Sequence, residues 1–197
     1  KLIKINKNKL EFHLSNSKVS YLFRVMDQIN QLEHLYFGKS IRHQENFDFL
    51  MEREVRPSNN QFEGDHTSSL EHIRQEYPGF GTSDFRYPAQ QVRYPSGDRI
   101  SRFEYADYRV MEGKPVLDGL PATYTESPEE AETLEILLKD AYSELTLHIY
   151  YTIYKDRPVI ARSAKFTNKG SEDYELETAM SLSIDFPDNN FELIHLN

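Results

Sequence analysis

Acidic side chains that could support hydrolysis gather at Glu129, Glu130 and Glu132. Cleavage of a glycosidic bond uses two carboxylates on opposite sides of that bond, one as an acid and the other as a nucleophile or base. Here two of the acids are adjacent, and they follow Ser127 and Pro128 directly, which is typical of a solvated approach to a hairpin. We therefore expect no catalytic pair within this chain.

Two other groups of residues have the composition of ligand sites without the spacing. His66 and His72, with Asp65 and Glu71, offer metal ligands, but they form no clean pair on one helix face. Residues 79–82 (Gly-Phe-Gly-Thr) are glycine-rich like a phosphate-binding loop, yet they lack its lysine and its strand-to-helix context. We expect loop histidines and a tight turn, and neither a metal nor a cofactor.

Aromatic side chains between residues 77 and 94 offer a different chemistry, because sugar rings stack on aromatic faces. The residues concerned are Tyr77, Phe80, Phe85, Tyr87 and Tyr94. An autonomous carbohydrate-binding module is therefore one hypothesis. The other is that these rings belong to the core and turns of a chain with 13 Tyr and 12 Phe.

Composition and charge exclude several kinds of partner and site. The net charge of −9 disfavours nucleic acid and anionic membrane surfaces as partners, since phosphates attract basic stripes. The chain has no cysteine, which excludes a disulfide framework and a catalytic thiol. No stretch has the apolar length of a membrane span or a signal-peptide core, so we expect a cytoplasmic protein.

Strict alternation of apolar and polar residues is the main periodic pattern, and it predicts half-buried strands over 145–153 and, as one very long strand, 174–186. Shorter alternations and turn signals fill the rest: apolar residues at 10–14, 21–25, 103–105 and 134–138, and turns near 16, 95–98, 112–113, 155–158 and 168–170. The prediction is an all-β chain, a large antiparallel sandwich with little helix. One short helix is expected from Ser68 to Tyr77.

Within this framework, several runs resemble a known family. They are residues 113–124 (GKPVLDGLPATY), 131–136 (AETLEI) and 75–88 (QEYPGFGTSDFRYP). Together they resemble the amino-terminal β-supersandwich domain, of galactose-mutarotase-like fold, in bacterial family 36 α-galactosidases. The likeness extends over nearly the whole chain, from residues 12–14 and 35–39 to 184–187 and 194–196.

The resemblance implies a non-catalytic part of a retaining enzyme acting on raffinose and melibiose. In that family the nucleophile and the acid/base are aspartates of a downstream (β/α)8 barrel, which this sequence does not contain. We expect one supersandwich domain over 1–197, truncated on its carboxyl side. The expected partners are the barrel of the same polypeptide, neighbouring subunits of a homo-oligomer (a tetramer in the family) and a galacto-oligosaccharide. A purely structural or assembly domain is the remaining alternative.

Residues 42–66, called here the insert, are the least strand-like and most polar part of the chain. The plain interpretation is a solvated loop whose charges pair locally. The resemblance implies a second role, in which the insert reaches the barrel of a neighbouring subunit and an acid accepts hydrogen bonds from sugar hydroxyls. The matching position is Glu52, where some relatives carry aspartate, and His66 is a companion candidate in place of a longer basic side chain.

Overall fold

The computed structural model describes residues 1–57, 60–82, 86–119, 122–186, 190, 192 and 194. Within these residues the regular structure is almost entirely β, which confirms the all-β prediction, and the two helical segments are single 3₁₀ turns. The strands are β1 (Ile3–Asn6), β2 (Glu11–Ser15), β3 (Val19–Val25), β4 (Leu32–Lys39), β5 (Gln61–Phe62), β6 (Asp65–Ser69), β7 (Gln90–Arg93), β8 (Phe103–Glu112), β9 (Ala131–Asp140), β10 (Leu145–Tyr154), β11 (Ile160–Asn168) and β12 (Glu175–Ala179); the 3₁₀ turns are η1 (Asp48–Leu50) and η2 (Pro128–Glu130).

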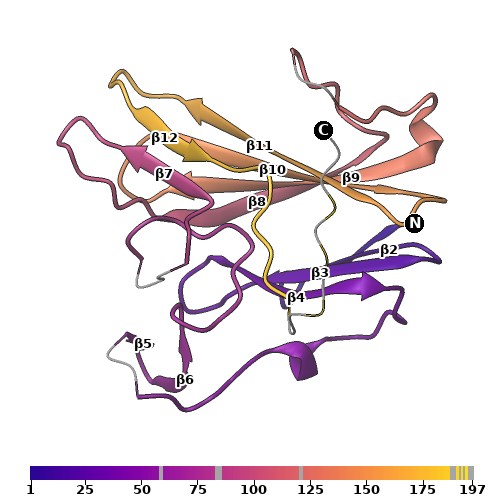
Figure 1. Ribbon diagram of the computed structural model, residues 1–197, viewed down its shortest axis with the longest axis horizontal. Helices are drawn as coiled ribbons and strands as arrows, with labels where there is room; N and C mark the ends of the chain where they lie inside the picture. The colour runs from indigo at the N-terminus through magenta and orange to yellow at the C-terminus, as the bar shows by residue number, and fades with distance from the viewer. Residues whose placement is uncertain are drawn as a thin grey trace.

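Two four-stranded antiparallel meanders face each other (Figure 1), with strand orders β1-β2-β3-β4 and β11-β10-β9-β8. Two-stranded ribbons, β12-β7 and β5-β6, lie beside them. Sequence turn signals fall at the hairpins: Asn16 Oδ1 accepts the N–H groups of Lys18 and Val19 at 2.7 and 2.9 Å, which closes the turn between β2 and β3. The expected antiparallel sandwich is confirmed.

The main core lies between the two sheets, as the alternation predicted. Leu147, Ile149 and Tyr151 of β10 are fully buried, and they face residues of β2 and β3 across the interface. Phe23 of β3 stacks on Tyr151 with ring centroids 4.6 Å apart, and Phe12 of β2 stacks on Phe23 at 5.0 Å. Such offset aromatic pairs add to the area that each ring buries, so they hold the sheets in register.

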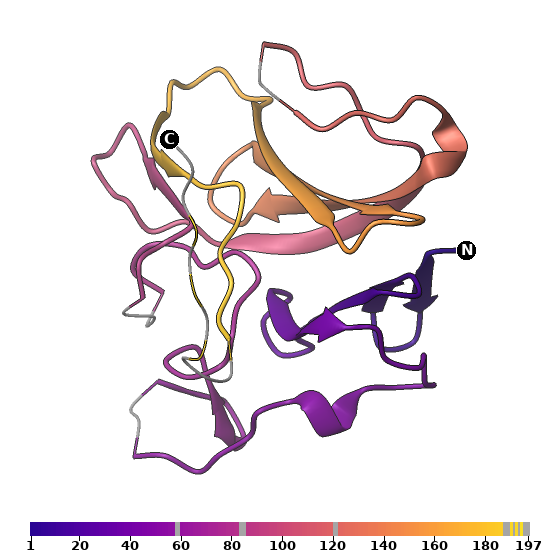
Figure 2. The same ribbon diagram turned by 45° about the vertical axis from the view of Figure 1, so that its right-hand side comes forward.

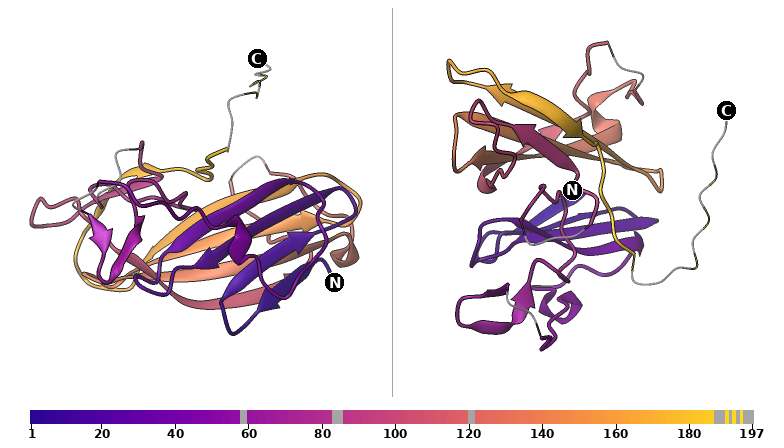
Figure 3. Two further views of the ribbon diagram at one scale, coloured as in Figure 1. Left: turned by 90° about the horizontal axis from the view of Figure 1, so that it is seen from below. Right: turned by 60° about the vertical axis from the view of Figure 1, so that its left-hand side comes forward.

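The insert covers the other face of the first sheet (Figure 3), so it is not simply a solvated loop. Phe47 is fully buried there against Leu22 of β3 and Leu35 of β4, and these three residues form a second apolar cluster. Every residue of β3 is consequently buried, because one face packs on the core and the other on the insert. The polar composition of the insert gave no indication that Phe47 is buried.

Two sequence predictions are wrong. The long strand over 174–186 is a strand only at β12, and Leu176, Met180 and Leu182 are 36–45% exposed. Beyond β12 the chain leaves the sheet and runs past the open side of the sandwich toward β4 (Figure 2), where Arg86 pairs with Asp185. Alternating apolar side chains do not by themselves indicate that a partner strand is present. The partner strand here, β7, has only four residues.

The helix expected from Ser68 to Tyr77 is also absent. Ser68 and Ser69 end β6, and the chain makes one turn, closed by the Ile73 N–H donating to the Ser69 carbonyl at 3.1 Å. It then becomes extended, because Glu76 donates its N–H to Leu32 of β4 and its side chain enters the core. Tertiary contacts override a weak local helix pattern. None of the helical segments in the described ranges is long and apolar enough to cross a bilayer.

Candidate functional site

Glu52 lies on the exposed side of the insert, where a carboxylate can meet a ligand. Its side chain is 52% exposed, and its Oε1 lies 3.3 Å from a guanidinium nitrogen of Arg74. Arg74 itself is mostly buried, with 14% of its side chain exposed. The sequence singled out Glu52 but gave no sign of this partner, which comes from the turn after β6.

The residue next to Glu52 fixes the backbone of the insert. Arg53 donates two hydrogen bonds to Glu33 of β4, at 2.8 Å to Oε1 and 2.9 Å to Oε2. Arg24 of β3 donates a third, from Nε to Oε2 at 3.1 Å. The Glu33 side chain is 2% exposed, so its charge is taken out of water and compensated by two guanidinium groups. This arrangement holds the position of Glu52 relative to the sheet.

His66 lies on β6, beside the segment that carries Glu52. The Glu54 N–H donates to the Thr67 carbonyl at 3.3 Å, which joins the two segments. The His66 ring is exposed, and its Nδ1 lies 3.1 Å from Gln61 Oε1. Its neighbour Asp65 accepts hydrogen bonds from Ser68 and Thr67, which lower the pKa of the Asp65 carboxyl to about 2.

The acids near residue 130 and the glycine-rich turn are part of the fold. Glu132 Oε2 accepts the N–H groups of Leu2 and Ile3 at 3.0 and 2.9 Å, so it ties β1 to β9. Glu129 and Glu130 form η2. Residues 79–82 make the expected tight turn, in which Gly81 has a φ of +75° and Thr82 donates to the Gly79 carbonyl. In the portion of the chain that the structure describes, no group of three or more His, Asp or Glu side chains could hold a metal ion.

Among the described aromatic candidates, two are held by their hydroxyls and two have exposed rings. Tyr77 donates from its hydroxyl to the Met180 carbonyl at 2.5 Å, and Tyr94 donates to Asp140 Oδ2 at 2.6 Å. Phe80 and Tyr87 are 40% and 73% exposed. Phe85 lies outside the described residues.

A buried polar network, which the sequence did not indicate, joins the two sheets at Glu76. Its carboxylate accepts hydrogen bonds from the hydroxyls of Tyr21 and Tyr151 at 2.8–3.0 Å and lies 2.6 Å from His34 Nδ1 and 3.2 Å from Arg162. Burial alone would raise the pKa of Glu76, but the Arg162 charge and the His34 hydrogen bond outweigh it and lower that pKa. These contacts compensate the buried charge of Glu76, so the network stabilises the packing of the two sheets, although Arg162 Nε has no hydrogen-bond partner among the described residues.

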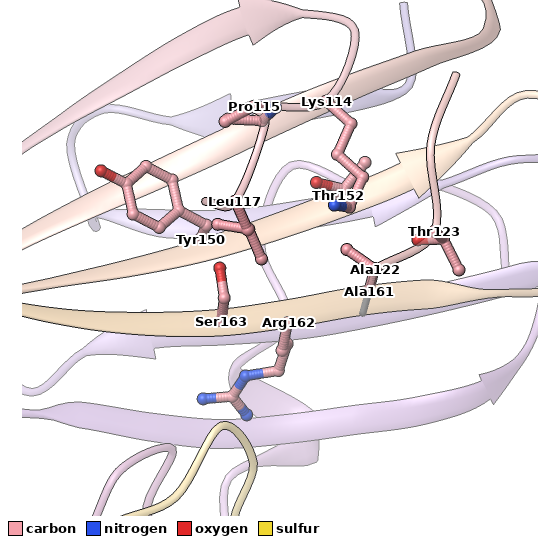
Figure 4. A pocket seen from close by; sticks show the side chains of 10 residues that line it. All are labelled: Lys114, Pro115, Leu117, Ala122, Thr123, Tyr150, Thr152, Ala161, Arg162 and Ser163. Carbon is pink, nitrogen blue, oxygen red and sulfur yellow. The ribbon is translucent and has the colours of Figure 1, made fainter. Parts of the chain in front are cut away.

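The outer face of the second sheet carries a cavity of about 240 Å³ beneath the segment that follows β8 (Figure 4). Hydroxyls of Thr123, Thr152 and Ser163 and the ring of Tyr150 line it, together with Lys114, Pro115, Leu117, Ala122, Ala161 and Arg162, whose guanidinium points away from it. Nearby, Glu135 accepts hydrogen bonds from Arg109 and Tyr150 and pairs with His148 Nδ1 at 2.8 Å. These contacts outweigh the partial burial of Glu135 and lower its pKa.

Comparison with known proteins gives one consistent result. Residues 30–197 match the family model described as the glycosyl hydrolase family 36 N-terminal domain. The chain is 42% identical over 186 residues to α-galactosidase AgaA of Geobacillus stearothermophilus, which covers 94% of this chain and 25% of that protein. It is 39% identical to α-galactosidase Mel36A of Lactobacillus acidophilus, over 99% of this chain and 27% of the relative.

Solved structures agree with these sequence matches. The α-galactosidase of Lactobacillus brevis superposes with a TM-score of 0.89 at 34% identity, over 95% of this chain and 25% of that one. Geobacillus AgaA superposes with a TM-score of 0.83 at 43% identity, over 90% of this chain and 24% of that one. A substituted form of AgaA has been solved in complex with raffinose. The chain thus spans about a quarter of the length of the relatives that it matches.

Proposed function

The chain belongs to the glycosyl hydrolase family 36 N-terminal domains, and from that membership we propose that it is the non-catalytic amino-terminal part of a retaining α-galactosidase. The observation that carries the proposal is the match of nearly the whole chain, in sequence and in fold, to about a quarter of the length of several α-galactosidases. The substrates would be terminal α-galactosides of the raffinose and melibiose type, in line with the raffinose complex of the Geobacillus relative.

In the parent enzyme the chemistry belongs to a downstream catalytic domain, where one carboxylate forms the glycosyl intermediate and a second acts as acid and then base. This domain would be a supersandwich that supports that barrel and contributes subunit contacts in a homo-oligomer. Glu52 supplies a half-exposed carboxylate on an anchored segment. Such a group accepts hydrogen bonds from vicinal sugar hydroxyls, so we assign it, with His66 of β6 as a companion, to the sugar pocket of a neighbouring subunit.

A substitution in the full-length parent enzyme tests this assignment. Glu52→Gln keeps the shape of the side chain but removes its charge. The loss of one charge-assisted hydrogen bond to the sugar should lower kcat/KM for raffinose about tenfold or more. Glu54→Gln is the matched control, because Glu54 lies two residues away and pairs with the exposed Arg56. Equal and small effects of the two substitutions would remove Glu52 from the sugar pocket.

The autonomous sugar-binding module is the alternative function. Its support is weak, since Tyr77 and Tyr94 use their hydroxyls to hold the backbone and Asp140. Calorimetric titration of the isolated chain with galactose and raffinose separates the two proposals, because only a module binds sugar without the barrel. The cytoplasmic location expected from the sequence stays a proposal, which cell fractionation would test.

A further inference from the structure

Arg74 occupies a fixed place beside strand β4. Its carbonyl accepts the His34 N–H at 2.9 Å, and the next residue, Gln75, forms an isolated antiparallel bridge with Glu33. The side chain is only 14% exposed, although it carries a charge, and it reaches outward to Glu52. A mostly buried arginine that extends to one exposed acid is poorly explained by stability, because ion pairs with an exposed partner contribute little.

The backbone at Glu52 is anchored to β4 as well, next to the residues Glu33 and His34 that hold Arg74. Arg53 places both of its terminal guanidinium nitrogens on the Glu33 carboxylate, and it also donates to the Glu52 carbonyl at 2.7 Å. The backbone on either side of the Glu52–Arg74 pair is therefore anchored to Glu33 and His34. Anchoring the backbone does not fix the side-chain rotamer of Glu52. The contact with Arg74 restricts that rotamer.

We propose that Arg74 is a positioning residue for Glu52. The proposal rests on the assignment of Glu52 to the sugar pocket. The guanidinium engages Oε1 and fixes the rotamer of Glu52, while about half of the side chain stays exposed to accept sugar hydroxyls. Arginine suits this role because it stays charged at all physiological pH values and its planar group holds a carboxylate in a defined orientation. Preorganising a ligand-binding group saves ordering free energy when the ligand binds.

A double-mutant cycle in the full-length enzyme tests the proposal, with KM for raffinose as the readout, since KM does not depend on the fraction of enzyme that is folded. Arg74→Gln should raise KM about threefold or more, and Arg74→Lys should restore part of the loss. In the Glu52→Gln background, Arg74→Gln should have no further effect on KM. Arg56→Gln is the matched control: it removes the Arg56–Glu54 pair of the insert, whose side chains are 54% and 60% exposed, and should leave KM unchanged.

Each outcome has a distinct meaning. If Glu52→Gln raises KM and Arg74→Gln does not, the positioning role is wrong while the sugar-pocket assignment stands. If the two effects are additive, Arg74 acts through something other than Glu52, and the proposal is overturned. If Glu52→Gln itself leaves KM unchanged, both the assignment and the proposal fail. Should Arg74→Gln not fold, Arg74→Lys in both backgrounds gives an equivalent cycle with a smaller expected rise in KM.

Discussion

Each deeply buried carboxylate described above is compensated, and this distinguishes it from a catalytic acid. Glu76 contacts Arg162, His34 and two tyrosine hydroxyls, and Glu33 contacts Arg24 and Arg53. A catalytic carboxylate needs a pKa matched to proton transfer and a free path to substrate. The pKa of Glu76 is instead lowered by its partners. At the scale of single residues, the buried charges of Glu76 and Glu33 stabilise the fold.

Glu76→Gln should therefore destabilise the chain strongly. Removing one member of a buried ion pair leaves the other uncompensated, which costs about 3–5 kcal/mol in the free energy of unfolding. Because the folded pKa of Glu76 is lowered from 4.5, its contribution is full above about pH 4.5 and is lost as the pH falls below that value. Urea titrations at pH 7 and pH 3 should show a large difference between variant and wild type at pH 7 and a smaller one at pH 3.

His13 predicts a second pH dependence, in a different range. Its ring is 1% exposed and lies between Ser20 Oγ and His43 Nδ1, and burial, followed by the charge of His43, lowers its pKa from 6.5 to about 4. The unfolded chain therefore binds a proton that the folded chain does not, so stability should fall as the pH drops from 6.5 to 4. A full shift of this size is worth about 3 kcal/mol.

Replacing His13 with Gln tests this dependence, because glutamine keeps polar atoms but does not titrate. Unfolding free energies measured between pH 7 and pH 4 should lose much of their slope in the variant. A slope identical to that of the wild type would show that other groups cause the loss of stability.

At the scale of elements, alternation predicts a strand well where a partner strand is present. The residues of β10 face alternately inward and outward, and β10 pairs with both β9 and β11, so its pattern and its environment agree. The same pattern over 174–186 does not give a long strand, because β12 pairs only with β7 and this pairing stops at Ala179. Likewise, nothing in the local sequence of the insert indicates that Phe47 is buried or that Arg53 meets Glu33, twenty positions earlier. Those contacts depend on the tertiary path of the chain.

The open edge of the second sheet predicts self-association of the isolated chain. In the described residues β11 ends its sheet, with β10 on one side, and an unpaired strand edge can recruit another chain. Light scattering over a concentration series should show dimers or larger species. Ser163→Lys, which adds a charge at this edge, should reduce them. A monodisperse monomer at high concentration would contradict this prediction.

At the scale of the whole molecule, two sheets, an insert and the segment after β12 form a scaffold that holds the Glu52 carboxylate at its surface. Glu52 is exposed on a segment that Phe47 and Arg53 fasten to the first sheet. The family and the sandwich could be predicted from the sequence because motifs and alternation are local. The partner of Glu52 could not, since Arg74 reaches it only through the fold.

The isolated 197-residue chain should not hydrolyse an aryl α-galactoside, although the full-length enzyme should. A retaining glycosidase places two carboxyl groups about 5–5.5 Å apart across the scissile bond. In this chain Glu76, Glu33 and Glu135 are each bound to basic side chains, and Glu52 acts in our proposal only as a hydrogen-bond acceptor. The measurement is release of the aryl group by rigorously purified chain, beside the full-length enzyme at equal concentration. Turnover that survives purification and disappears on substituting a single acid would locate a catalytic site within this domain and overturn its role as a scaffold.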